Sequence, residues 1–245
     1  MDDNTLGPLK PRLLALLAQS AADWHDFVAN LSPAARGATG SADTWAAKDH
    51  IAHMTAWKGQ SARLLAAAAR GETPAATPDE TEYNPQVFAE WKDRPWEAVL
   101  AWAARVDADL TSAIESCTED NLTDPEGFPG RPGRALWTLV PGNCYEHPNE
   151  HFAQFYLAEG DPERAAAVYE AAPPIVARIF GESEAYSHAV YNLGCFYARS
   201  GQPGPALDAV RRALTINPDL REWAGTDVDL VPLHDNPELK ALVGA

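Results

Sequence analysis

The chain has 245 residues, 46% of them hydrophobic, so it can build a packed core and wholesale disorder is excluded. Lys and Arg number 19 against 35 Asp and Glu, which gives a formal net charge of −16. Phosphate backbones and anionic membranes repel so acidic a chain, and we therefore expect it to bind neither nucleic acid nor a membrane.

The cysteines and the N-terminal segment predict a compartment. Cys117, Cys144 and Cys195 are odd in number and far apart, which fits neither a disulfide framework nor a paired metal motif and indicates a reducing environment. The N-terminal segment MDDNTLGPLKPR lacks the basic-then-apolar layout of a signal peptide. The longest apolar stretch, residues 64–69, is too short to span a bilayer. We therefore expect a soluble, cytoplasmic protein.

Apolar residues recur at helical spacing in the first half of the chain, and no segment alternates as a strand would. A first helix is expected over residues 11–31 and a second over residues 45–70. Asp43 or Thr44 is expected to cap the second helix, because either side chain can accept a hydrogen bond from its first-turn amides. Residues 72–82 are rich in Pro, Thr and Ala, which predicts a loop.

Two further helices complete this pattern. The third is expected to begin at Asn84-Pro85, with the asparagine as cap, and to break and restart at Pro95. Residues 124–133 (DPEGFPGRPG) are expected to form a long loop, which is a candidate cover for a pocket. The fourth helix is expected within residues 143–160. The predicted fold class is all-α, an up-and-down four-helix bundle over residues 1–160.

The remaining residues, 161–245, are expected to form a separate helical extension. A Leu-Gly pair, an aromatic residue, small residues and a terminal proline have the spacing of one tetratricopeptide repeat; they are Leu193, Gly194, Tyr197, Ala206, Val210, Ala213 and Pro218. A weaker, earlier copy predicts an inserted loop around Pro173-Pro174, and Asn236-Pro237 is expected to start a final helix.

A single repeat of this kind cannot bury both of its faces. We expect the extension to stack on the fourth helix of the bundle and complete its core, or to bind a protein partner or a second copy of the chain.

Among the seven histidines, one pair has the spacing of a metal site. His147 and His151 are four residues apart, which places both imidazoles on one helical face. His53, on a predicted inward face, is the best third ligand, and three nitrogens with an open position are typical of a catalytic metal. His50, one turn earlier, is a substitute ligand, a proton carrier or a residue of the substrate pocket, or is half-exposed. The alternative is that these histidines are hydrogen-bonded core residues.

Other residues near this pair could take part in chemistry. Glu146 and Glu150 are candidate general bases, or solvated carboxylates. Tyr145 could donate a hydrogen bond into a cavity, or pack in the core. Cys144, near a predicted helix N-terminus, could have a lowered thiol pKa, or be a small buried residue. Trp57 is the aromatic residue expected to line an apolar pocket near His53.

Three segments carry a family resemblance. They are TWAAKDHIAHMTAW (residues 44–57), NPQVFAEWKDRPWEAV (residues 84–99) and NCYEHPNEH (residues 143–151). In this order they resemble motifs of the DinB/YfiT-like superfamily, closest to the ClbS/DfsB family, which is named for a colibactin self-protection protein. The resemblance covers roughly residues 9–160. One departure is Pro148 after the first histidine, which predicts that the helix begins at or near His147.

The resemblance implies a four-helix bundle that holds a divalent metal, such as Zn or Ni, through one histidine of the second helix and two of the fourth. These positions match His53, His147 and His151. It also implies a hydrophobic small-molecule substrate, since relatives include thiol-dependent transferases, isomerases and proteins that open strained electrophilic rings.

Three functions follow as hypotheses. The first is a metal-dependent hydrolase or thiol transferase that acts on an electrophilic small molecule, with a role in self-protection. The second is metal-free binding or ring opening of such a compound by carboxylates and Tyr145. The third is an interaction module built on the tetratricopeptide-like extension.

Overall fold

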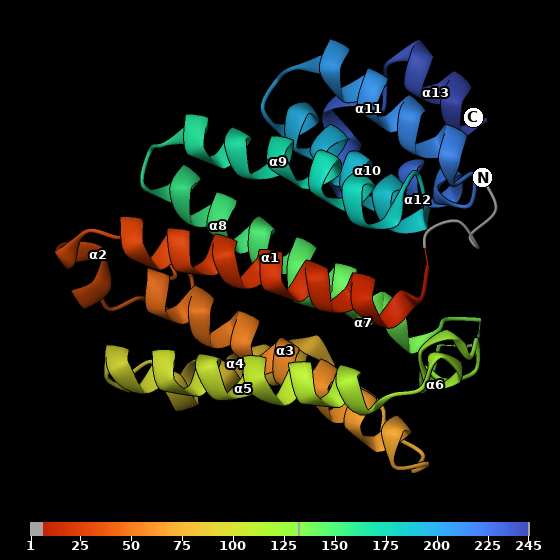
Figure 1. Ribbon diagram of the computed structural model, residues 1–245. Coiled ribbons are helices and arrows are strands. Elements are labelled where there is room, and N and C mark those ends of the chain that lie inside the picture. Colours follow the sequence, from red (N-terminus) through yellow and green to blue (C-terminus); the bar gives the residue numbers. More distant parts are fainter. Residues whose placement is uncertain (1–6, 132, 245) are drawn as a thin grey trace. The chain divides into compact units, whose positions relative to one another are not determined.

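The computed structural model describes residues 7–131 and 133–244, and every regular element in these ranges is helical (Figure 1). The predicted all-α class is therefore confirmed. The chain divides after Gly160 into two compact units. Within the described ranges, none of the helices combines the length and the apolar character that crossing a membrane requires.

The first unit contains the predicted four-helix bundle. Its elements are α1 (Leu9–Asn30), α2 (Pro33–Gly37), α3 (Ala47–Ala69), α4 (Glu80–Trp91), α5 (Trp96–Ser116), α6 (Glu119–Thr123), η2 (Leu136–Thr138), α7 (Leu139–Pro141), η3 (Gly142–Glu146) and α8 (His147–Ala158). Helix α5 contacts α1 and α3, and α8 contacts the same two helices from the other side, so that the four long helices close a ring. They run alongside one another in Figure 1.

The buried stripe of α5 shows why these helices associate. Val99, Ala103, Val106 and Leu110 recur every three or four residues and are all buried. Burial of each large apolar side chain of such a stripe stabilises the fold by about 1.5–3 kcal/mol. Helix α3 contacts α5 most extensively and is buried on most of its surface, so the bundle holds it in place from several directions.

The predicted caps of α3 and α4 are wrong. Helix α3 begins at Ala47, not at Trp45, and the Ala46 N–H donates to Asp49 Oδ2 at 2.9 Å, so the capping carboxylate comes from inside the helix. Helix α4 begins at Glu80, with Asp79 as the cap, because the Asp79 side chain accepts from the N–H of Thr81. Because α4 starts four residues before the predicted Asn84, the loop predicted over residues 72–82 ends at Asp79.

The break predicted at Pro95 is confirmed, since α5 starts directly after it at Trp96. The predicted end of the second helix is also confirmed, because α3 stops at Ala69 and Gly71 adopts a φ of 69°. Residues 124–131 and 133 contain no regular element, as predicted for the long loop.

Pro148 fits into the fourth helical segment by two devices. Regular α8 begins at His147, as predicted, but the chain before it is already helical, because η3 is a π-helical turn in which the His147 N–H donates to Gly142 C=O. Proline lacks the N–H that would bond to the carbonyl of Cys144 four residues earlier. The hydroxyl of Ser20 on α1 donates to that carbonyl at 2.6 Å instead, so the buried oxygen keeps a partner.

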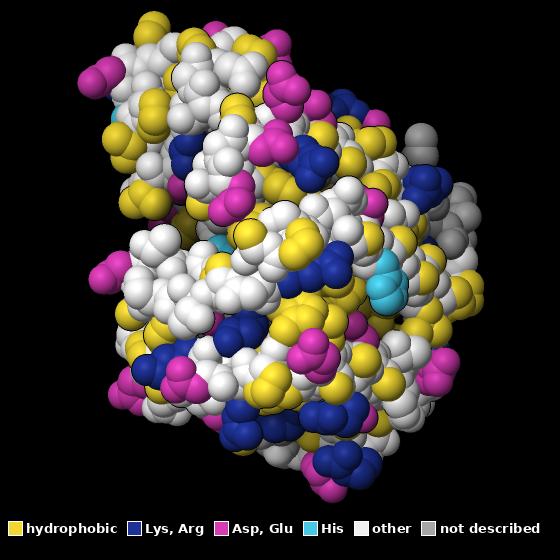
Figure 2. Space-filling view, turned by 90° about the vertical axis from the view of Figure 1, so that its left-hand side faces the viewer, with side chains coloured by type: hydrophobic (Ala, Val, Ile, Leu, Met, Phe, Trp, Pro, Cys, Tyr) yellow, Lys and Arg dark blue, Asp and Glu magenta, His cyan; other side chains and the backbone are white. Residues whose placement is uncertain are grey.

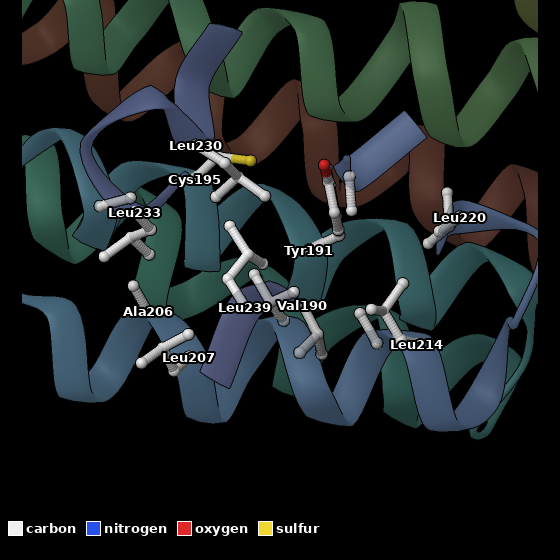
Figure 3. Packing of buried hydrophobic residues seen from close by; sticks show 14 residues of the cluster. Val190, Tyr191, Cys195, Ala206, Leu207, Leu214, Leu220, Leu230, Leu233 and Leu239 are labelled. Carbon is white, nitrogen blue, oxygen red and sulfur yellow. The ribbon is translucent and has the colours of Figure 1, made fainter. Parts of the chain in front are cut away.

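The second unit packs three consecutive helices and a short C-terminal tail. Its elements are α9 (Pro162–Phe180), α10 (Glu184–Arg199), α11 (Pro203–Ile216), α12 (Leu220–Ala224), η4 (Val228–Leu233) and α13 (Pro237–Val243). Val190, Tyr191 and Cys195 of α10 and Leu207 of α11 belong to one buried cluster, which Figure 3 shows together with leucines of the tail. The predicted final helix is confirmed, with Asn236 as its cap.

The inserted loop predicted around Pro173-Pro174 is wrong, because α9 continues through both prolines to Phe180. The buried residues Tyr169 and Val176, on either side of the prolines, lie on one continuous apolar face of this helix. Burial of that face outweighs the hydrogen bonds that the two prolines cannot make. The turn lies at residues 181–183 instead.

The formal net charge of the chain is −16. On the face drawn in Figure 2, acidic, basic and hydrophobic side chains are interspersed, and the acidic side chains do not merge into one patch there.

Gly194 allows the close approach of α10 and α11. A Cβ atom at this position would lie 2.9 Å from Val210 Cγ2 and 3.3 Å from the Ala206 carbonyl oxygen, whereas nothing lies within 4 Å of one at Gly204. We expect Gly194→Leu to lower the free energy of unfolding by about 1–3 kcal/mol through overpacking. The matched Gly204→Leu should change it by less than about 0.5 kcal/mol. Urea unfolding followed by circular dichroism measures both values, and equal effects would contradict the close approach.

Candidate metal centre

Three imidazole nitrogens converge between α3 and α8. His53 Nε2 and His151 Nε2 each lie 3.0 Å from His147 Nε2, and one ligand nitrogen of each ring lies within 4.8 Å of the other two. Metal–imidazole bonds of about 2.0–2.1 Å place adjacent ligand nitrogens roughly 3.0–3.4 Å apart. The structure thus brings together the three histidines that the sequence predicted as ligands. We refer to these three residues as the imidazole triad.

The chemistry of the triad fits a cation better than internal hydrogen bonds. A neutral imidazole nitrogen carries either one hydrogen or one in-plane lone pair. His147 Nε2 has two nitrogen neighbours at 3.0 Å and can satisfy only one of them fully. A metal ion accepts the lone pairs of all three nitrogens at once, so the donor set suits a divalent ion.

Burial keeps the triad neutral. It lowers the pKa of His147 to about 4, with a smaller contribution from the nearby Lys58 ammonium. It lowers the pKa of His53 to about 3, assisted by repulsion from His147 and His50. The pKa of His151 is lowered as well, chiefly by burial. At neutral pH the rings therefore offer lone pairs for which protons do not compete.

His50 contacts the triad from behind rather than joining it. Its Nδ1 lies 3.0 Å from Nδ1 of His151, on the side of that ring away from the triad. When His50 Nδ1 accepts a hydrogen bond from His151 Nδ1–H, His151 Nε2 is left with its lone pair facing the other two nitrogens. His50 is thus placed to set the tautomer of one candidate ligand.

Trp45 covers the histidines from one side. Its ring stacks on His151 with a centroid distance of 5.8 Å, and it also contacts the rings of His50 at 5.4 Å and His53 at 4.9 Å. An indole in this position excludes water from three imidazoles, which strengthens the desolvation that lowers their pKa values.

Charged residues at the start of α3 fix the helix that presents His53. The buried Lys48 ammonium donates to the carbonyls of Lys92 at 2.6 Å and Arg94 at 3.0 Å, directly after α4. Asp49 accepts from Ala46 N–H, and there is no space for a Cβ at Gly40, which would lie 2.0 Å from Asp49 Oδ2. These contacts hold the register of α3, because each joins it to a different segment.

A cavity of about 610 Å³ opens beside the triad. His53 and His147 line it, whereas His50 and His151 are not among its lining residues. Trp57 lines it too, and its Nε1–H donates to Asn84 Oδ1 at 3.0 Å. The remaining lining residues are Thr77, Pro78, Asp79, Glu80, Phe128, Arg131, Arg134, Thr138, Leu139, Gly142 and Asn143.

Among the predicted catalytic residues, none lines this cavity. Tyr145 is only 1% exposed and lies in the core. Glu146 and Glu150 are partly buried, and Glu150 accepts a hydrogen bond from Gln154 on the same helix. The lowered thiol pKa considered for Cys144 is wrong, since complete burial raises it to about 12, and the alternative of a small buried residue is confirmed.

Comparison with known families identifies this architecture. Residues 16–154, more than half of the chain, match the model of the DinB superfamily. The chain belongs to the DinB superfamily. No curated protein and no solved structure matches the sequence. The closeness to the ClbS/DfsB family and the tetratricopeptide-like character of the extension stay predictions.

Several features of this DinB centre were not predicted as site residues. Asn84, which the sequence predicted as a helix cap, orients Trp57 at the cavity. Trp45, which the sequence singled out only as part of a motif, stacks on His151. The sequence predicts that the long loop covers a pocket, and Phe128 and Arg131 of that loop, with Arg134 directly after it, line the cavity. The Pro-Gly-Arg pattern was the signal in the sequence that could have indicated these arginines.

The depressed pKa values predict how stability depends on pH. Between pH 6.5, the ordinary pKa of histidine, and about pH 4, the unfolded chain binds more protons than the folded DinB bundle. We therefore expect the free energy of unfolding of chelator-treated protein to fall as the pH falls through this range. The slope should approach about 1.4 kcal/mol per pH unit for each titrating histidine.

Urea unfolding at several pH values measures this slope. His53→Gln should reduce it, whereas His25→Gln, which replaces an exposed histidine, should leave it unchanged. A free energy of unfolding that is flat between pH 6.5 and 4 would contradict the neutral, desolvated triad.

Proposed function

We propose that the protein is a metal-dependent enzyme that acts on an electrophilic small molecule, by hydrolysis or by addition of water or a thiol. The observation that carries this proposal is the convergence of three neutral imidazole nitrogens, two of them belonging to residues that line a cavity. Membership of the DinB superfamily supports it.

In this proposal, one set of residues holds the ion and another contacts the substrate. A divalent ion such as Zn or Ni, held by His53, His147 and His151, would act as a Lewis acid that lowers the pKa of a bound water or thiol. Because the three ligands are neutral, they leave the charge of the ion uncompensated. Trp57 and Phe128 supply apolar surface that suits a hydrophobic substrate.

Metal titration tests the proposal directly. We expect the purified, chelator-treated protein to bind Zn and to gain thermal stability, by about 2.7 kcal/mol at a metal concentration one hundred times the Kd. His151→Ala should abolish this gain, because it removes one of three ligands. His50→Gln should weaken binding by about tenfold to a hundredfold without abolishing it, since it removes only the partner of a ligand.

Replacement of the exposed His25 is the control and should bind Zn like the wild type. Elemental analysis reports metal content independently of stability. If the protein as purified holds no metal and chelator changes neither its stability nor its activity, metal-free binding or ring opening replaces the metal-dependent function.

In its finer form, the proposal is self-protection of the ClbS/DfsB type against a strained, electrophilic natural product. The aromatic wall of the cavity supports it, because Trp57 is held by its hydrogen bond to Asn84 and by an edge contact with Tyr83 at 5.3 Å between ring centroids. Such a rigid apolar wall suits a hydrophobic compound.

Substitution of this wall tests the finer proposal. Cells that express Trp57→Ala should survive only about one tenth or less of the concentration of a cyclopropane-bearing toxin that wild-type expression permits, because a lost apolar contact is worth about 1.5–3 kcal/mol. Trp223→Ala, which removes an exposed tryptophan of the second unit, should protect fully. Equal survival with both variants would contradict the role of Trp57.

A further inference from the structure

Two arginines of a tandem Pro-Gly-Arg repeat line the cavity. Residues 129–134 read PGRPGR, and the two repeats end in Arg131 and Arg134. The Arg131 N–H donates to Phe128 C=O at 3.1 Å, and the Arg134 N–H donates to Arg131 C=O at 3.1 Å. Gly130 and Gly133 have φ values of 75° and 79°, which favour glycine. Each arginine thus ends one repeat of the sequence and donates its backbone N–H to a carbonyl three residues earlier.

Both arginines line the cavity together with His53 and His147. Within residues 7–131 and 133–244, neither guanidinium has a carboxylate partner, although the chain carries 35 Asp and Glu. Arg131 instead lies over the ring of Phe128, with its Cζ 5.3 Å from the ring centroid. Two unpaired guanidinium groups in so acidic a chain are available to an incoming anion.

Neither Asp79 nor Glu80, the acidic residues of the same cavity, forms an ion pair with these arginines within residues 7–131 and 133–244. Asp79 accepts hydrogen bonds from Thr81 N–H at 2.8 Å and Thr81 Oγ1–H at 2.5 Å, which commits one of its oxygens to the cap of α4. Glu80 follows it in the first turn of that helix, where the helix dipole favours a negative charge.

Resting on the proposed function, we propose that the substrate carries an oxyanion group, a carboxylate or a phosphate, which Arg131 and Arg134 bind while its electrophilic carbon faces the imidazole triad. The planar guanidinium fork matches the geometry of either oxyanion. The apolar part of the same molecule would contact Trp57 and Phe128. The substrate class thus becomes an amphipathic acid rather than a purely hydrophobic compound.

The turns make this arginine pair effective. The ring of Pro129 fixes φ in the turn that precedes Arg131, so less conformational entropy is lost when an anion binds. Because a hydrogen bond to a charged group contributes about 1.5–3 kcal/mol, each arginine should account for about a tenfold change in affinity or more.

Isothermal titration calorimetry on the full chain tests the proposal with three probes: glutarate, inorganic phosphate and the neutral glutaramide. Chelator-treated protein is used first, so that an anion cannot bind through a metal. We expect glutarate or phosphate to bind and glutaramide not to bind. Arg131→Gln and Arg134→Gln should each weaken binding by about tenfold, and the double variant should abolish it.

Arg105→Gln is the matched control, because it removes an exposed arginine of α5 outside the cavity. It should leave the anion affinity unchanged. Comparison of the glutarate and phosphate arms then identifies which oxyanion the site prefers. Absence of binding by both anions, equal binding of glutaramide, or unchanged affinity in the double variant would each overturn the proposal.

Zn titration of the same proteins separates this proposal from the proposed function. The double arginine variant should keep wild-type Zn affinity, because neither arginine belongs to the triad. Failure of the wild type to bind Zn would contradict the metal-dependent function and leave the anion result standing. Loss of anion binding with intact Zn affinity would support the arginine site specifically.

Discussion

The structure depends on one constraint: three neutral imidazole nitrogens face one another at distances that internal hydrogen bonds cannot satisfy fully. His147 Nε2 is shared between His53 and His151, each 3.0 Å away. Protonation of a ring at neutral pH does not relieve this conflict, because burial lowers the pKa values of all three rings. A divalent ion would resolve the conflict, and the surrounding residues keep the rings converged.

The fold holds this arrangement from two sides. On α3, Lys48 bonds to the segment directly after α4, and Asp49 bonds to the loop before α3. These contacts fix the position of His53 along the axis of the bundle. On α8, the π-helical turn and the hydroxyl of Ser20 accommodate Pro148, directly beside His147. Loss of the contacts on α3 would move His53, and loss of those on α8 would move His147, since packed helices shift as units rather than deforming locally.

The cavity extends the chemistry beyond the triad. Its apolar wall, formed by Trp57 and Phe128, lies in the same enclosure as two arginines that have no acidic partner among the described residues. Under our proposal, such a combination would distinguish two ends of a ligand, one apolar and one anionic. The segment that carries Arg131 and Arg134 therefore lines the cavity as well as connecting two helices.

The sequence by itself determined the helical class and the bundle, because helical periodicity is a local property. The spacing of His147 and His151 likewise placed both on one helical face, beside which the structure brings His53. It did not determine the cap of α3 or the start of α4, where Asp49 and Asp79 accept from backbone N–H groups in place of the predicted caps. Nor did it determine the path of α9 through Pro173-Pro174, where tertiary burial outweighs local signals. Only the tertiary structure decided that His50 lies behind the triad and that Tyr145 lies in the core, because the rotation of a helix depends on the neighbours against which it packs.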